Sequence, residues 1–329
     1  MGKRILGVGS ALVDALIQLD DNKLLENFNL LPGSMTLVDS ELSQKILKSS
    51  ENLERTIVTG GSAANTVRAI CQLTGKAGFL GKIGKDENGV FFRNEFEKQG
   101  ADTHLIFGDI PTGVAATLIS PDSERTFGTY LGAASELLPE EISEDVLSQY
   151  DLIHVEGYLI FNHNLIETIL KKAKTCGLIT SLDMVSYNIV EANYEFLQYL
   201  VKEYVDILFA NEEEAFVFTG LDPEKAVAEM SKQCDIAVVK IGPKGSLIQS
   251  GDNFIKIDAD KVESIDTTGA GDVYAAGFLY GLVNDYSLAD CGKIGTIMGA
   301  EVVQVLGAKV PECLIPGIVG RINGKSPSH

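Results

Sequence analysis

Apolar and polar positions along the chain follow two alternating patterns. Short apolar runs at residues 151–155 and 179–182 are each followed by a segment in which apolar residues recur every three or four positions, at 165–174 and 194–203. Runs of the first kind are typical of buried strands, and segments of the second kind are typical of amphipathic helices. The order strand, helix, strand forms a βαβ unit, so the sequence predicts an α/β fold with a mostly parallel sheet and helices on both faces.

Two stretches, residues 10–39 and 111–132, depart from this order. In the second stretch GVAATLIS and RTFGTYLG indicate two strands, and the PDSE between them is typical of a hairpin turn. The first stretch has a similar character, so we expect the two to pair in a small sheet apart from the main one. The predicted boundaries are residues 1–13, 41–110 and 133–329 for the core, and residues 14–40 and 111–132 for the small sheet.

Composition and charge narrow the class of protein. The 329 residues are 45% hydrophobic and 22% charged, which is typical of a globular protein. Lysine and arginine number 27 against 46 acidic residues, a net charge of −19, so we expect no binding to nucleic acid or to anionic membranes. The first residues lack the apolar stretch of a signal peptide, and the longest uncharged apolar run spans only residues 273–283. We therefore expect a cytoplasmic protein.

The strongest chemical signal is SIDTTGAGD, residues 264–272, which precedes the helix-like run VYAAGFLYGLV. A glycine turn that opens a helix exposes the first free amides of that helix, and these amides bind anions with the help of the helix dipole. Gly269 and Gly271 allow a ligand to come close to the backbone. Asp272 has two alternative roles: it caps the helix, or it accepts the proton of a hydroxyl that attacks a phosphoryl group held by the same amides.

Polar residues nearer the N-terminus indicate a site for hydroxyl groups. Gly60 and Gly61 precede the helical segment SAANTVRAI, whose first turn carries Asn65. Asp14 follows the first apolar run, and a carboxylate that accepts two hydrogen bonds suits a vicinal diol. On its own, an aspartate at such a position is more often a turn residue, so that alternative stays open.

The sequence NEEE, from Asn211 to Glu214, follows the apolar run ILFA. Ligands of α/β sheets bind at the carboxyl ends of the strands, and ligand sets made of oxygen atoms suit hydrated Mg²⁺. The alternative is an acidic first helical turn, which the helix dipole favours without any ligand. A dinucleotide site is disfavoured because GVGSAL, residues 7–12, lacks the third small residue of that fingerprint.

Together these motifs resemble the ribokinase family of carbohydrate kinases, also called the PfkB family. The similarity is carried by DTTGAGDVYAAGF at 266–278, GGSAANT at 60–66, NEEE at 211–214 and KIGPKGS at 240–246, in the order and spacing of the family. The resemblance implies a three-layer αβα core with a small β-sheet lid. It also implies an enzyme that uses ATP and Mg²⁺ and transfers a phosphoryl group to a primary hydroxyl of a sugar or nucleoside.

The resemblance further implies roles for individual residues. Asp272 is expected to be the catalytic base, and Arg125, on the predicted hairpin, matches an arginine that closes over the transferred phosphate in relatives. An exposed hairpin arginine is the alternative for Arg125. Lys240 replaces the threonine found in many members, which leaves its role open. The expected residues are Gly269, Ala270 and Gly271 for the anion hole; Asp14, Gly60, Gly61 and Asn65 for the acceptor; Asn211, Glu214, Lys240, Gly242, Gly245 and Gly295 for the nucleotide and Mg²⁺; and Asp266 and Thr268 for a monovalent cation such as K⁺.

Further similarities bear on the acceptor. LLPGSMTLVD, RTFGTYLGAA, VEGYL and GTIMGAEVVQVLGAK resemble the bacterial adenosine kinase-like branch of the family. The flat base of a nucleoside needs an apolar slot, for which Phe127, Tyr130, Tyr158 and Phe161 are candidates, although such residues more often serve ordinary packing. Ribose, fructose or 2-keto-3-deoxygluconate as the acceptor, and a sensor without turnover, stay open as alternatives. We expect a homodimer formed by pairing of lid edges.

Overall fold

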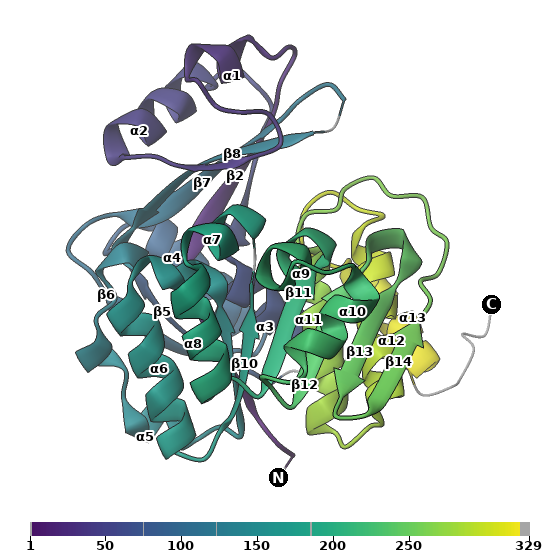
Figure 1. Ribbon diagram of the computed structural model, residues 1–329. Coiled ribbons are helices and arrows are strands. Elements are labelled where there is room, and N and C mark those ends of the chain that lie inside the picture. The colour runs from purple at the N-terminus through teal and green to yellow at the C-terminus, as the bar shows by residue number, and fades with distance from the viewer. Residues whose placement is uncertain (1, 75, 123, 185, 323–329) are drawn as a thin grey trace.

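Two β-sheets of unequal size organise the chain in the computed structural model (Figure 1). The structure describes residues 2–74, 76–122, 124–184 and 186–322. The larger sheet lies between layers of helices, and the smaller sheet projects from one end of it. This arrangement is the predicted α/β fold with a layered core and a small second sheet.

The larger sheet is mostly parallel, as predicted. All neighbouring strands from β12 to β6 pair in parallel, and at the other edge β13 pairs antiparallel with both β12 and β14. In spatial order the strands are β14 (Asn253–Ile257), β13 (Ser246–Ser250), β12 (Ile236–Lys240), β11 (Ile207–Asn211), β10 (Ile179–Asp183), β9 (Leu152–Glu156), β1 (Ile5–Val8), β5 (Gly78–Ile83) and β6 (Asp102–Phe107).

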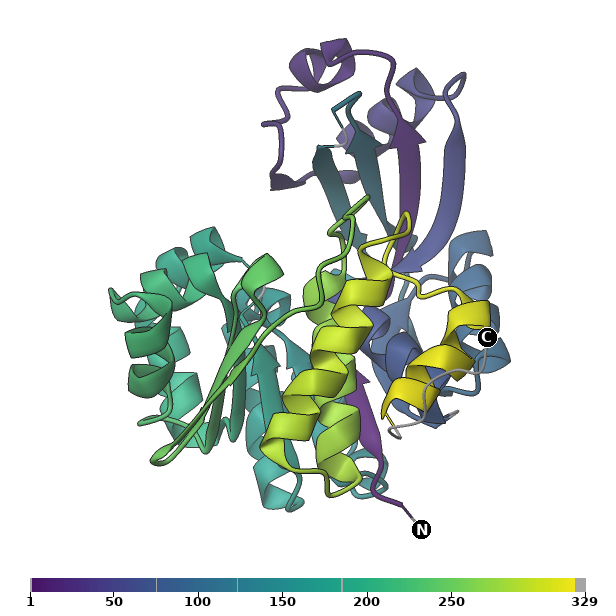
Figure 2. The same cartoon turned by 90° about the vertical axis from the view of Figure 1, so that its right-hand side faces the viewer.

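Both faces of this sheet are buried under helices. Successive residues of a strand point to opposite faces, so in β11 Leu208 belongs to one hydrophobic core and Phe209 to the other. Figure 2 shows α11 and α12 side by side on the second face. The first face carries α5 (Glu144–Leu147), α6 (His163–Thr175), α7 (Tyr187–Ala192), α8 (Tyr194–Tyr204), α9 (Glu212–Thr219) and α10 (Pro223–Met230); the second carries α3 (Ser62–Thr74), α4 (Glu87–Lys98), α11 (Ala270–Val283), α12 (Leu288–Val302) and α13 (Ile315–Ile322). Short 3-10 helices lie at Ala133–Glu136, Pro139–Glu141, Gly157–Phe161, Gly242–Lys244 and Glu312–Leu314.

The smaller sheet contains the predicted hairpin, in which β7 and β8 pair antiparallel. Ser123, in the predicted turn between them, lies outside the described residues. In spatial order the strands are β3 (Met35–Leu37), β8 (Arg125–Gly132), β7 (Thr112–Ile119), β2 (Leu12–Gln18) and β4 (Arg55–Gly60), and the helices α1 (Lys23–Asn27) and α2 (Ser40–Ser49) cover one side.

The extent of the smaller sheet differs from the predicted boundaries. Residues 41–60, expected in the core, belong with the small sheet, because β4 pairs along β2 and Ile46 of α2 packs against Ile17 and Leu118. The amphipathic pattern of α2 predicts a helix, but it carries no information about which of two sheets that helix covers. Within the described residues, no helix combines the length and the apolar character needed to cross a bilayer.

Candidate active site

A cavity of about 890 Å³ lies where the smaller sheet faces the carboxyl ends of the parallel strands. Three adjacent strands, β10, β11 and β12, contribute their last residues to it, namely Asp183, Asn211 and Lys240. Residues of β2 and β8 line the opposite side. The volume falls in the range of small-molecule sites, and the position is the one at which open α/β sheets bind ligands.

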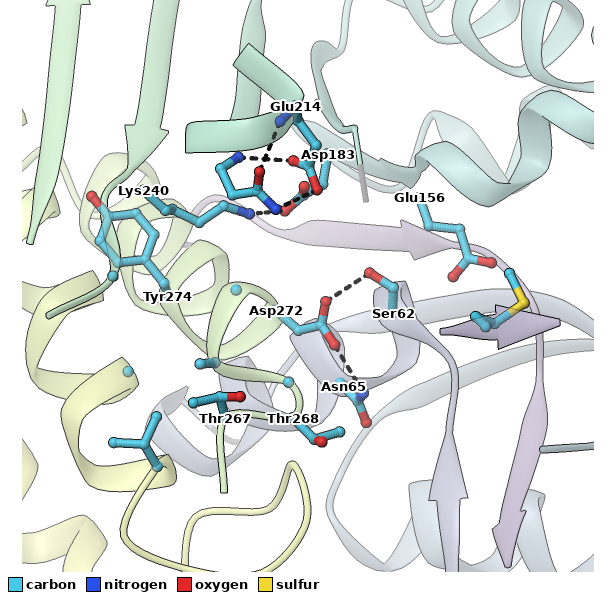
Figure 3. Close-up of a pocket in the computed structure, with 18 of the residues that line it drawn as sticks. Ser62, Asn65, Glu156, Asp183, Glu214, Lys240, Thr267, Thr268, Asp272 and Tyr274 are labelled. Carbon is cyan, nitrogen blue, oxygen red and sulfur yellow. Dashed lines mark hydrogen bonds and ion pairs between the residues drawn. The ribbon is translucent and has the colours of Figure 1, made fainter. Parts of the chain in front are cut away.

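Asp272 occupies the centre of this cavity and is held by the N-terminal turn of α3 (Figure 3). The hydroxyl of Ser62 donates to Oδ1 of Asp272 at 2.7 Å, and the side-chain amide of Asn65 donates to Oδ2 at 2.9 Å. Burial raises the pKa of Asp272 to about 6, although these two hydrogen bonds oppose the shift. Asp272 does not cap its own helix, because Gly269 holds the N-cap position of α11. Its carboxylate is therefore oriented into the cavity as a proton acceptor.

Arg68 fixes the direction of the Asn65 amide, a role that the sequence analysis missed. The guanidinium is 3% exposed, and its Nη2 donates to Oδ1 of Asn65 at 2.7 Å. Because that oxygen accepts from Arg68, the nitrogen of the same amide faces Asp272 as a donor. The signal in the sequence is an arginine three residues after Asn65, on the same side of a predicted helix.

The first turn of α11 offers free backbone amides beside Asp272. Gly269 has a φ of 71°, and a Cβ there would meet the Cβ of Ala308 at 2.2 Å, so only glycine fits the turn. The amide of Ala270 donates to the carbonyl of Thr267, whereas the amides of Gly271 and Asp272 have no partner within the helix. Residues 269–272 all line the cavity. The residues predicted to form an anion hole thus lie on the cavity wall, and their binding of a phosphate stays a prediction.

Asp14 and the residues around it form the acceptor side of the cavity. Asp14 lies on β2, and burial raises its pKa to about 6, with Arg68 and Arg125 opposing that shift. Gly61 and Asn65 line the cavity with Asp14. Gly60 does not line it but packs beneath, since a Cβ at Gly60 would meet Oδ1 of Asp14 at 2.0 Å.

Asn211 and Glu214 form a capping box at the start of α9, and both line the cavity. The Asn211 side chain accepts from the amide of Glu214 at 2.9 Å, and Glu214 accepts from the amide of Asn211 at 2.8 Å. Burial raises the pKa of Glu214 to about 7. Asn211 and Glu214 therefore cap α9, as the alternative without a ligand predicts. The carboxylate of Glu214 nevertheless lies on the wall of the cavity.

Lys240 lies beside the anion hole, paired with an acid that the sequence analysis did not single out. Its ammonium donates to Oδ2 of Asp183 at 2.7 Å, and it lies 3.1 Å from the position of a Cβ on Gly271. Gly242 and Gly245 line the same part of the cavity. Gly295, predicted beside them, instead packs against α11, where a Cβ would meet the carbonyl oxygen of Tyr274 at 2.9 Å.

Arg125 and Asp266 form an ion pair that the sequence analysis did not predict. Arg125 is not one of the residues that line the cavity; its guanidinium is buried in an ion pair with Oδ2 of Asp266. The same oxygen accepts from the amide of Gly307, and Oδ1 accepts from the amide of Thr268. Asp266 thus joins β8 to the loop before α11, and its role as a ligand of a monovalent cation stays a prediction.

Apolar side chains, several of them on the small sheet that carries Asp14, form one wall of the cavity. Of the four predicted aromatic candidates, Phe127, Tyr158 and Phe161 line the cavity and Tyr130 does not. The remaining apolar residues of this wall are Leu12, Met35, Leu37, Ala115 and Leu131.

A carboxylate poised next to free helix amides, below a small sheet that covers the strand ends, defines a kinase of small molecules. The chain belongs to the pfkB family of carbohydrate kinases, whose family model matches residues 34–313. Enzymes of this family are phosphotransferases with an alcohol acceptor, and they use ATP with Mg²⁺.

Relatives and solved structures agree on the family but differ in the acceptor. The 5-dehydro-2-deoxygluconokinase of Bacillus subtilis (strain 168) is 31% identical over 262 residues, which cover 74% of this chain and 80% of that protein. The adenosine kinase structure from Sinorhizobium meliloti is 30% identical with a TM-score of 0.86, covering 94% of this chain and 96% of that one. A probable sugar kinase from Rhizobium etli CFN 42 is 30% identical with a TM-score of 0.89, covering 98% and 99%.

Proposed function

We propose that this kinase transfers the γ-phosphoryl group of ATP to the primary hydroxyl of a nucleoside similar to adenosine. The observation that carries the proposal is the apolar wall of the cavity, part of which lies beside Asp14 on the small sheet. One end of the acceptor site then binds hydroxyl groups, and the other offers Phe127 and Tyr158 to a flat, uncharged ring. A nucleoside has both parts in one molecule.

The charges around the acceptor site support the same choice. Among the described lining residues only Lys240 and Lys261 are cationic, and they come from β12 and from the loop after β14. Arg68 and Arg125 are buried in contacts with other protein groups. A sugar acid would bring its carboxylate next to Asp14 and Asp272, and the buried cations whose charge acts on Asp14, Arg68 and Arg125, are already bound to protein groups.

The nucleotide half of the cavity fits Mg-ATP. Lys240 supplies an ammonium beside the predicted anion hole, on a side chain that is 15% exposed, and Glu214 supplies a buried carboxylate. Within the described residues, no group of three acidic, histidine or cysteine side chains gathers to hold a metal directly. This agrees with Mg²⁺ bound mainly through phosphate oxygens and water, with Asn211 and Glu214 reaching it through water. Bound Mg²⁺ neutralises phosphate charge.

Asp272 and the helix amides carry out the proposed chemistry. Ser62 and Asn65 hold the carboxylate, which accepts the proton of the attacking primary hydroxyl. The amides of Gly271 and Asp272 donate to the oxygens of the transferred phosphoryl group. Asp14 and Asn65 hold the remaining hydroxyls, which fixes the direction of attack. No step of this proposal uses K⁺, which stays a prediction from the family resemblance.

A sugar kinase is the second candidate, favoured by the relative named 5-dehydro-2-deoxygluconokinase. ADP release from Mg-ATP, measured with adenosine, inosine, guanosine, ribose, fructose and 2-keto-3-deoxygluconate, separates the two. The variant Asp272→Asn, which lacks the proposed base, is the negative control. We expect turnover with nucleosides and none in the negative control. Turnover confined to free sugars would support the second candidate, and ATP binding without turnover on any acceptor would indicate a sensor.

A further inference from the structure

Glu156 is a buried acid at the cavity that no step of the proposed chemistry uses. It ends β9, is 1% exposed and lies on the opposite side of Ser62 from Asp272 in the view of Figure 3. Burial raises the pKa of its carboxyl group to about 7. A buried acid is costly unless its oxygens have partners, so its contacts indicate what it does.

Both oxygens of Glu156 accept from the backbone where the chain passes between the two sheets. Oε1 accepts from the amide of Ser10 at 2.8 Å, in the first crossing, which we define as residues 9–11 between β1 and β2. Oε2 accepts from the amide of Ala63 at 3.0 Å, directly after the second crossing, which we define as residues 60–62, where the end of β4 leads into the start of α3. One side chain of the core thus holds two crossings.

The two crossings touch each other around this carboxylate. A Cβ at Gly61 would meet the carbonyl oxygen of Ser10 at 2.1 Å, and a Cβ at Gly9 would meet Oε2 of Glu156 at 2.2 Å. Gly61 is followed directly by α3 and has no side chain to cap that helix, so Glu156 provides the cap from another strand. Small movements of either crossing therefore change the contacts of Glu156.

Each crossing leads to residues of the acceptor site. The first crossing runs into β2, which carries Asp14, and the second runs into the helical turn that carries Ser62 and Asn65. We infer that Glu156 is a positioning residue, which fixes Asp14 and Asn65 relative to Asp272 by tying both crossings to the core. This inference rests on the proposed function for the role of Asp14 and Asn65. It assigns Glu156 a role through the backbone of both crossings, since each of its oxygens accepts from one amide.

The substitution Glu156→Gln tests the inference. The glutamine oxygen accepts from one crossing, but its NH₂ group faces the other backbone amide, donor against donor. We expect the KM for the acceptor to rise about tenfold or more, while the Kd for Mg-ATP without acceptor changes less than about twofold. Glu156→Asp keeps the charge but is one methylene shorter, so it reaches one crossing and gives a smaller rise.

Asp86→Asn is the matched control. Asp86 is also a carboxylate that holds a crossing, since it accepts from the amide of Thr112 at 2.8 Å where the chain enters β7. That crossing carries none of the polar acceptor residues. If Glu156 only stabilises the fold, Glu156→Gln and Asp86→Asn are expected to have the same kinetics. If Glu156 positions the acceptor residues, the KM for the acceptor rises only in the substitutions of Glu156. An unchanged KM in Glu156→Gln, or an equal rise in Asp86→Asn, overturns the inference.

Amide hydrogen exchange separates this inference from the proposed function. In Glu156→Gln we expect faster exchange at the amides of Ser10 and Ala63, with no change there in Asp86→Asn. This readout needs no acceptor, so it decides whether Glu156 holds the crossings even if the protein phosphorylates none of the compounds tested. Full protection of both amides in Glu156→Gln contradicts the inference. Turnover of a nucleoside with an unchanged KM contradicts it too and leaves the proposed function standing.

Discussion

At the scale of single residues, burial sets the chemistry of the cavity. Asp272 and Asp14 both have a pKa raised to about 6, because desolvation disfavours their charged forms. A carboxylate with that pKa is still ionised at neutral pH and accepts a proton more readily than an ordinary aspartate. The same burial that raises the pKa therefore makes Asp272 a better base.

The pH dependence follows from these two groups. The reaction needs Asp272 deprotonated, so kcat/KM for the acceptor is expected to fall as the pH decreases below about 6. One titrating group gives a slope of about tenfold per pH unit, and a second group at a similar pKa makes the slope steeper. Glu156 and Glu214, whose pKa values burial raises to about 7, titrate near this range in both proteins. A pH profile of the wild type and of Asp14→Asn therefore measures the difference, and the substitution is expected to make the slope shallower. A profile that is flat down to pH 5 contradicts the assignment of Asp272 as the base.

Lys240 is the second residue whose surroundings point to a function. Its ammonium lies beside Gly271 in the anion hole, held by Asp183. Lys240→Met is expected to lower kcat/KM for ATP about a hundredfold, since a positive charge next to the phosphates is lost. Lys261→Met, which removes the other lysine that lines the cavity, is the control and is expected to change this value less than about threefold. Equal effects of the two substitutions would contradict a specific role of Lys240 in binding the phosphates of ATP.

At the scale of elements, one ion pair joins β8 to the loop before α11. Arg125 begins β8, and Asp266 accepts from it and from the amide of Gly307 near the C-terminal segment. Both side chains of the pair are less than a tenth exposed. One buried ion pair, which we call the joint, therefore links the small sheet to the loop before α11 and to the segment after α12.

Breaking this joint is expected to destabilise the protein. Arg125→Met leaves the Asp266 carboxylate buried without its cation, which costs about 3–5 kcal/mol of unfolding free energy. Urea denaturation measures the loss, and the double variant Arg125→Met, Asp266→Asn is expected to recover part of it because no buried charge is left unpaired. A loss below about 1 kcal/mol in the single variant would contradict the account of the joint.

The sequence predicted local elements well and long-range partners poorly. The motif at residues 264–272 placed Gly269 and Asp272 correctly at the start of α11, because local glycine chemistry defines such a turn. The membership of α2 and β4 in the small sheet depends on packing between segments far apart in sequence. Arg125 and Asp266 lie 141 residues apart, and no local pattern connects them. Glu156 and Asp183 stand at the ends of predicted strands, but an acid at a strand end does not reveal what it will contact.

At the scale of the whole molecule, a net charge of −19 works against anionic ligands. The site opposes this locally with Lys240 and with the free amides of α11, all on the nucleotide side. The acceptor side has acids and apolar side chains, so the two halves suit an anion and a neutral molecule. A homodimer through the edge strands β3 and β4 of the small sheet stays a prediction, because the single chain does not test it.

The most direct test of the central claim is a competition between two acceptors. Equal concentrations of adenosine and 2-keto-3-deoxygluconate are incubated with Mg-ATP and the enzyme, and mass spectrometry identifies the phosphorylated product. The account predicts a nucleoside 5′-monophosphate as the main product and no product with Asp272→Asn. Phosphorylation of the sugar acid alone, or product formation at the wild-type rate by Asp272→Asn, would contradict it.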